Sequence, residues 1–228
     1  MRIDIVSIFP EYFQGPLTCS LLKQAQAKGK VTFHLHNPRD FTYDAHRTVD
    51  AKPFGGGAGM VLKPEPIFQC VEGLPKKGWV ILLSPRGRPL THAVSVGLSK
   101  KKHLVLVCGH YEGIDERVSD QLAHEEISVG DFVTMGGEAP ALCLIESIVR
   151  LIPGVLGNRE SLKEESFSDA ANGASGGRLE FPQYTRPSVF RRWKVPSVLL
   201  SGDHRKIEEW RKKKSLAVTK RKRPDLLK

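Results

Sequence analysis

The chain has 228 residues, of which 40% are hydrophobic and 26% charged, and this ordinary globular composition excludes wholesale disorder. No apolar run approaches the roughly 20 residues of a membrane-spanning helix, and the N-terminus lacks the apolar stretch of a signal peptide. We therefore expect a soluble, cytoplasmic protein without a membrane partner. The net charge is +10, of which residues 211–228 carry +8 through nine basic residues and one acid. Such a segment favours RNA or DNA as a partner, although a solvated basic terminus would have the same composition.

The elements of the first two thirds of the chain follow from apolar periodicity. Alternation over residues 2–9 predicts a strand, helical spacing over 18–28 predicts a helix, and 31–36 is predicted to be a second strand. A polar connection over 39–60 is long enough to indicate a functional loop. Strands separated by helices predict an α/β domain with a mainly parallel sheet over about 1–153. The remaining expected helices lie at 64–71, 91–98 and 140–151, and the remaining strands at 79–83, 104–108 and 126–129.

The composition changes after residue 153. Residues 154–177 are polar and rich in Gly, Ala and Ser, which is typical of a linker. A basic segment that contains Trp193 and Trp210 follows, and we expect it to be helical from about residue 187. Either tryptophan could stack on nucleic-acid bases, but core packing is the more common role. The expected division is a domain over 1–157, a flexible linker over 158–180 and a small basic helical domain over 181–228.

Motifs of several enzyme classes are missing from the sequence. The cysteines (Cys19, Cys70, Cys108 and Cys143) form no C-x-x-C pair and have no His pair nearby, so we expect buried free thiols and no metal site. The loop 55–60 fails the dinucleotide-binding pattern because Met60 stands where its last glycine belongs. A phosphate-binding loop with Lys-Ser or Lys-Thr and a nucleophile elbow are also absent.

Four glycine-bearing loops are the strongest indication of a site. Three of them follow predicted strands, and open α/β sheets bind ligands at the carboxyl ends of their strands. Glycine there lets backbone N–H and C=O groups approach a flat ligand closely, so we expect one base-sized pocket, with plain turns as the alternative. Acidic residues in the loops are individually more often caps or surface charges. The loops cover residues 54–59, 84–87, 108–113 and 129–137.

Several long motifs occur in a distinctive order: FPEYF, HRTVDAKPFGGGAGM, LLSPRGRPLT, LVCGHYEGIDERV, SVGDFVTMGGEAPAL, RLIPGVLG and PQYTRP. Together they resemble the bacterial tRNA (guanine-N1)-methyltransferases of the TrmD type, a branch of the SPOUT methyltransferases, from residue 1 to about 227. The resemblance implies a SPOUT-type mainly parallel sheet with helices on both faces, a C-terminal trefoil knot and a small helical C-terminal domain. It also implies a homodimer with active sites at the subunit interface.

The resemblance further implies the reaction. S-adenosylmethionine (SAM) would donate a methyl group to N1 of guanosine at position 37 of tRNA, next to the anticodon, with a requirement for Mg2+. Residues 1–157 would bind SAM and residues 181–228 would bind tRNA, with Asp50, Gly59 and Glu112 at the target guanine. The implied SAM-binding positions, many of them acting through backbone groups, are Leu83, Ser84, Pro85, Gly109, Val129, Gly130, Asp131, Phe132, Val133, Thr134, Gly136, Gly137 and Pro140.

Guanine N1 must lose its proton as it attacks the methyl group, so the reaction needs a base and a cation that stabilises the charge on O6. The resemblance assigns the cation to Arg150. The family's base is an aspartate in an acidic-Asp-Ser-Phe pattern, and here Glu165 occupies that position. Asp169 is the competing candidate.

Three other functions are compatible with parts of the sequence. Another SPOUT methyltransferase could act on ribosomal RNA, although the HRTVDAKPFGGGAGM segment argues for the tRNA guanine family. An RNA-binding protein that has lost catalysis is supported only by the glutamate at the base position. A Rossmann-type methyltransferase would need a glycine-rich fingerprint after the first strand, which this sequence lacks.

Overall fold

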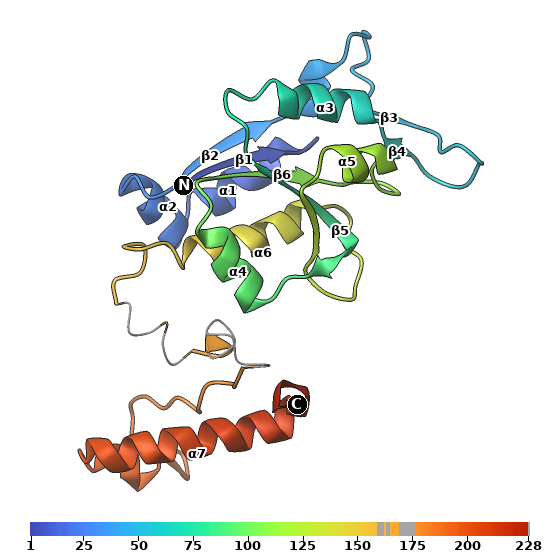
Figure 1. Ribbon diagram of the computed structural model, residues 1–228. Coiled ribbons are helices and arrows are strands. Elements are labelled where there is room, and N and C mark those ends of the chain that lie inside the picture. Colours follow the sequence, from blue (N-terminus) through green and yellow to red (C-terminus); the bar gives the residue numbers. More distant parts are fainter. Residues whose placement is uncertain (159–161, 163–164, 169–176, 228) are drawn as a thin grey trace. The chain divides into compact units, whose positions relative to one another are not determined.

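The computed structural model in Figure 1 describes residues 1–158, 162, 165–168 and 177–227. The chain divides into two compact units, Met1–Gly157 and Asn158–Lys228. The roles expected for these units, and for a linker over 158–180, stay predictions.

The N-terminal unit is built on a five-stranded sheet with the strand order β2-β1-β6-β5-β7. Every neighbouring pair in this sheet is parallel. Parallel strands need long crossover connections, which are mostly helical here. The predicted α/β fold with a mainly parallel sheet is therefore confirmed. The strands are β1 (Arg2–Val6), β2 (Thr32–His36), β5 (Trp79–Pro89), β6 (His103–Cys108) and β7 (Glu125–Ser128).

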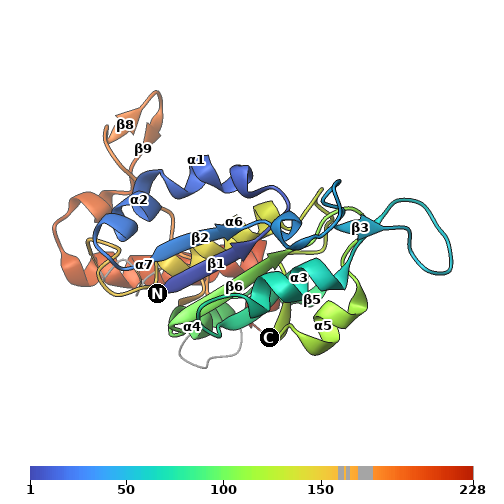
Figure 2. The ribbon, with the colours of Figure 1, turned by 90° about the horizontal axis from the view of Figure 1, so that it is seen from above.

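Helices cover both faces of the sheet (Figure 2). Alternate residues of the buried strands point to opposite faces, so Leu104 and Leu106 enter one apolar cluster while Val105 and Val107 enter another. The first cluster packs against α1 (Gln14–Leu17), α2 (Ser20–Ala27), α4 (His92–Ser99) and α6 (Glu138–Val149). The second packs against α3 (Pro64–Glu72) and α5 (Glu116–Gln121). Two 3-10 turns, η1 (Pro10–Phe13) and η2 (Pro38–Phe41), follow β1 and β2.

The predicted strands and helices of this unit are all present, with small shifts of their ends. Thr91 is the N-cap of α4, where its hydroxyl accepts a hydrogen bond from the Val94 N–H at 3.3 Å. β5 is longer than predicted because, after a shift of register beyond Leu83, it pairs with β7 again through Arg88. Two further short strands, β3 (Asp50–Ala51) and β4 (Val61–Leu62), form an antiparallel pair within the long polar connection, where the sequence predicts none.

The C-terminal unit differs from the predicted helical segment. Residues near 187 form a two-stranded antiparallel hairpin of β8 (Val189–Phe190) and β9 (Trp193–Lys194), followed by the 3-10 turn η5 (Ser197–Leu200). Pro187 and Pro196 flank the hairpin, and proline disfavours a continuous helix there. The basic helix α7 (His204–Lys222) begins later, at Asp203, whose carboxylate accepts a hydrogen bond from the Lys206 N–H. A last 3-10 turn, η6 (Pro224–Leu227), follows α7.

Two hydrogen bonds tie the segment around Leu179 to α7. The Leu179 N–H donates to Thr219 Oγ1 at 2.9 Å, and Ser215 Oγ donates to the Leu179 carbonyl at 2.6 Å. Trp193 is 65% exposed, so the expectation of core packing is wrong for this residue. Trp210 is half-buried, with its ring centroid 6.3 Å from that of Tyr184.

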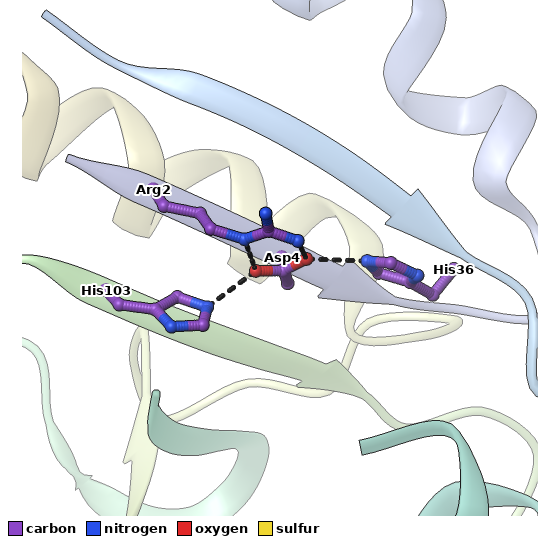
Figure 3. A network of polar contacts seen from close by, with 4 residues as sticks. All are labelled: Arg2, Asp4, His36 and His103. Atoms are coloured by element: carbon purple, nitrogen blue, oxygen red, sulfur yellow. Dashed lines mark hydrogen bonds and ion pairs between the residues drawn. The ribbon is translucent and has the colours of Figure 1, made fainter. Parts of the chain in front are cut away.

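A buried carboxylate on β1 contacts side chains of the two neighbouring strands, β2 and β6 (Figure 3). Asp4 on β1 is fully buried and accepts two hydrogen bonds from Arg2, at 2.6 and 2.7 Å. His36 Nε2 on β2 and His103 Nε2 on β6 each lie 2.6 Å from one of its oxygens. Burial by itself raises the pKa of Asp4, but the hydrogen bonds with these three side chains outweigh it and lower the pKa to about 2.

All four cysteines are free thiols. Cys70 and Cys108 are buried as expected, and burial raises the pKa of Cys70 to about 12 and that of Cys108 as well. Cys19 and Cys143 are exposed, so the expectation of burial is wrong for these two. Within the described ranges, no helix combines the length and apolar character that crossing a bilayer requires.

Candidate active site

A candidate site is a cavity of about 440 Å³ at the carboxyl ends of β6, of β7 and of the first paired part of β5, which ends at Leu83. This edge of a parallel sheet is where open α/β folds bind ligands, and the volume suits a nucleoside-sized molecule. The cavity is lined by β5 around its shift of register, by the loop after β6, and by the end of β7 with the loop into α6: residues 82–86, 109–114 with 116, and 126–129 with 132–137 and 140.

The expected SAM-binding positions converge on this cavity. All of them except Gly130 and Asp131 line it. His110, Tyr111 and Arg86 also line the cavity. The sequence places them in the glycine-bearing loops of the expected pocket but assigns no role to any of them. The binding roles of the whole set stay predictions.

Close backbone approach explains why the loops after β6 and β7 meet. The Gly137 N–H donates to the Gly109 carbonyl at 2.7 Å. A Cβ on Gly137 would lie 2.8 Å from Cys108 Cα and from Gly109 N, which is too close for any real side chain. The start of α6 can therefore reach the end of β6 only with glycine at this position.

A buried polar network supports the same region. Glu138, the first residue of α6, is 4% exposed. The hydroxyl of Ser7, directly after β1, donates to its Oε1 at 2.6 Å. Its Oε2 lies 3.8 Å from His110 Nδ1 in the wall of the cavity. One carboxylate thus connects the ends of β1 and β6 with the start of α6.

The three expected substrate residues differ in their relation to the cavity. Glu112 lines it, and its N–H donates to the carbonyl of Met60 at 3.0 Å. Gly59 has a φ of +75°, and a Cβ there would overlap the Glu112 carboxylate, so the glycine loop packs directly on Glu112. Asp50 lies in β3 at the base of this loop and does not line the cavity.

Arg150 and the cavity lie at opposite ends of α6. Pro140, in the first turn, lines the cavity, whereas Arg150 is the C-cap residue. At a rise of 1.5 Å per residue, the helix between them is about 15 Å long. The cavity of one chain is therefore lined without that chain's own Arg150.

The two candidate bases belong to the C-terminal unit. Glu165 lines a smaller cavity of about 190 Å³ together with Ser168, Arg178 and Arg211. Asp169 lies outside the described residues, so the choice between the two carboxylates stays a prediction.

Apolar side chains crowd the rim of the larger cavity. Phe132, Val133 and Met135 are large, exposed and close together in the loop after β7. Exposed apolar groups of this kind mark interaction surfaces more often than free surface. As to metals, the described part of the chain has no group of three or more His, Cys, Asp or Glu side chains that could hold an ion.

Comparison with known proteins gives a consistent result. A family model described as tRNA (Guanine-1)-methyltransferase TrmD matches residues 1–228. A tRNA (guanine-N(1)-)-methyltransferase of Gloeobacter violaceus is 57% identical over 230 residues, which cover 100% of this chain and 98% of that protein. Proteins of the same name from Dictyoglomus turgidum and Brevibacillus brevis are each 54% identical over 100% of this chain, with 90% and 91% of their own lengths covered.

Proposed function

The chain belongs to the TrmD family of tRNA (guanine-1)-methyltransferases, and from that premise we propose that it methylates N1 of guanosine at position 37 of tRNA, next to the anticodon. The chain is a SAM-dependent tRNA (guanine-N1)-methyltransferase, and tRNA is its substrate. This membership removes the alternatives of a ribosomal RNA methyltransferase, a Rossmann-type methyltransferase and a binding protein without catalysis.

The cavity at the ends of β5, β6 and β7 is the observation that carries the proposed site. Its apolar walls, which include Leu83, Ile127 and Val129, suit the faces of an adenine ring. Its glycine loops expose backbone groups that suit the ring's polar edge. When bound, SAM supplies an electrophilic methyl group on a positively charged sulfur. Glu112 adds a carboxylate to the cavity wall, which complements that charge.

Two side chains perform the proposed proton and charge chemistry. Arg150 donates hydrogen bonds to guanine O6, where negative charge develops. Glu165 accepts the proton from N1 while the bond from N1 to the methyl carbon forms and the bond from that carbon to sulfur breaks. The bonding electrons stay with sulfur, so the donor leaves neutral. Asp50 and Gly59 hold the target base from the β3–β4 loop.

A homodimer with the active sites at the subunit interface fits these residues. Arg150 is about 15 Å along α6 from the cavity wall, so a second copy of the chain is the proposed source of the arginine at each site. The exposed apolar rim of Phe132, Val133 and Met135 supports pairing at this edge. The trefoil knot implied for this region is part of the same proposal.

Mg2+ and a cytoplasmic location are the remaining parts of the proposal. The family resemblance implies a magnesium requirement, but no ligand cluster of three or more side chains exists among the described residues. A cytoplasmic location, where tRNA would be reached, stays a prediction.

Labelled SAM tests the proposed target directly. A tRNA transcript with guanosine at position 37 should accept the methyl group, and the same transcript with adenosine there should accept almost none. Equal labelling of the two transcripts would remove position 37 as the target.

A further inference from the structure

The β8–β9 hairpin exposes two large aromatic side chains, Phe190 and Trp193. Every residue from 183 to 194 is exposed, including Phe190 at 57% and Trp193 at 65%. In Figure 2 the hairpin stands clear of α7. Large aromatic side chains of this exposure, placed side by side, are typical of a surface that binds a partner.

The two rings form one platform with a cation above it. The ring centroids of Phe190 and Trp193 lie 6.0 Å apart with an interplanar angle of 39°. The guanidinium carbon of Arg191, in the turn of the hairpin, lies 5.5 Å from the first centroid and 5.8 Å from the second. Arginine over aromatic faces is an arrangement that also accommodates a nucleobase by stacking.

The positive charge around the two aromatic rings indicates a negatively charged partner. Residues 181–202 contain four basic residues (Arg186, Arg191, Arg192 and Lys194) and no acid. Two copies of this hairpin would bring the same cations together, so charge disfavours a second hairpin as the occupant. A polyanion with flat, unpaired rings matches both the cations and the aromatic faces.

We propose that the hairpin Val189–Lys194 is a tRNA-binding element, on which an unpaired base stacks against Phe190 and Trp193 while Arg191, Arg192 and Lys194 contact the flanking phosphates. This inference rests on the proposed function, because it takes tRNA as the ligand. It assigns the hairpin to substrate affinity, with no part in the methyl transfer itself.

Truncation of the platform tests the stacking step. The Phe190→Ala, Trp193→Ala double variant should bind the tRNA transcript about 10- to 100-fold more weakly at fixed salt, since stacking on an aromatic side chain is worth about 1–3 kcal/mol per base. The KM for tRNA should rise, while kcat and the KM for SAM stay unchanged. The Trp193→Phe variant should restore most of the affinity because a ring remains. The control is Leu200→Ala, which truncates an apolar residue of the same unit that is 62% exposed and should change nothing.

The cations require a separate measurement. The triple variant Arg191→Gln, Arg192→Gln, Lys194→Gln should flatten the plot of log affinity against log salt by about 0.7 to 0.9 for each phosphate that the protein no longer neutralises. Quenching of tryptophan emission by tRNA should be smaller in Trp193→Phe than in the wild type if a base stacks on that ring.

Methylation of the guanosine-37 transcript by the wild type is measured in parallel. This measurement distinguishes a failure of the proposed function from a failure of the hairpin inference. If the wild type binds tRNA but does not methylate position 37, the proposed function fails and the hairpin comparison still stands. If the double variant binds tRNA within twofold of the wild type, the hairpin inference is wrong. It is also wrong if the double variant keeps its tRNA affinity but sediments as a smaller species, because the hairpin would then be an interface between copies.

Discussion

Glu165 is the proposed base, where the family resemblance implies an aspartate, and its extra methylene changes its reach by about an ångström. We expect Glu165→Gln to lower the single-turnover rate about 100-fold or more, because the amide cannot accept the N1 proton. Asp169→Asn should keep most of the rate. Calorimetric SAM binding should be equal in both variants. A wild-type rate in Glu165→Gln, together with a loss in Asp169→Asn, would reverse the assignment.

The sequence gives no sign of the structural role of Glu138, because it places this residue just before a predicted helix, where an acidic residue is common. Replacing it with alanine would leave the Ser7 hydroxyl buried without its acceptor, at a cost of about 1–3 kcal/mol. A double-mutant cycle of Ser7→Ala and Glu138→Ala, read by chemical unfolding, should show a coupling of at least about 0.5 kcal/mol. Additive effects would mean that the hydrogen bond contributes nothing.

Asp4 makes a prediction about acid stability. Its pKa falls from 3.8 to about 2 on folding, so the carboxylate stabilises the native state by about 2 kcal/mol above pH 4. That contribution is lost as the pH falls from about 4 to about 2. Asp4→Asn should therefore be destabilised at neutral pH and show a flatter stability profile over this window. Asp120→Asn, on the exposed face of α5, is the control. A wild-type acid profile in Asp4→Asn would contradict the account.

Two glycines, one at the N-cap of α6 and one within α4, differ in the space around them and should respond differently to substitution by alanine. Gly137 in the contact between α6 and β6 has no space for a Cβ, whereas a Cβ on Gly97 in α4 meets nothing within 4 Å. Gly137→Ala should weaken SAM binding about tenfold or more. Gly97→Ala should raise the free energy of unfolding by about 0.5–1 kcal/mol, since alanine favours a helix. Calorimetry and urea unfolding measure both, and normal SAM binding by Gly137→Ala would refute the close approach.

The elements that the sequence predicts well are those with a sustained pattern. β6 is a continuous apolar run between polar ends, and α4 begins at a hydroxyl N-cap. β3 and β4 are two residues long and carry no period that could be detected. The β8–β9 hairpin lies where the sequence predicts a helix. The prediction follows the basic composition of the segment, which does not register the effect of Pro187 and Pro196 on a continuous helix. For the site, glycine spacing predicts the loops, but the close approach of Gly137 to Cys108 depends on a crossover that no spacing reveals.

The proposed homodimer brings Arg150 of one copy to the cavity of the other, since Arg150 lies at the far end of α6 from the cavity of its own chain. Arg150→Ala and Gly137→Ala proteins should each be inactive alone. After co-expression, random pairing should restore about one quarter of the wild-type activity, because half of the dimers would contain one intact site. Activity that stays absent in the mixed dimers would mean that each chain uses its own arginine.

The proposed reaction places a methyl group on N1 of one guanosine in tRNA. Methylation of N1 blocks the pairing edge of guanine, so primer extension on the methylated tRNA reports its position. We predict a single new stop opposite position 37 that depends on SAM and disappears in Glu165→Gln. A stop at another nucleotide, or labelled tRNA without any stop, would contradict the account.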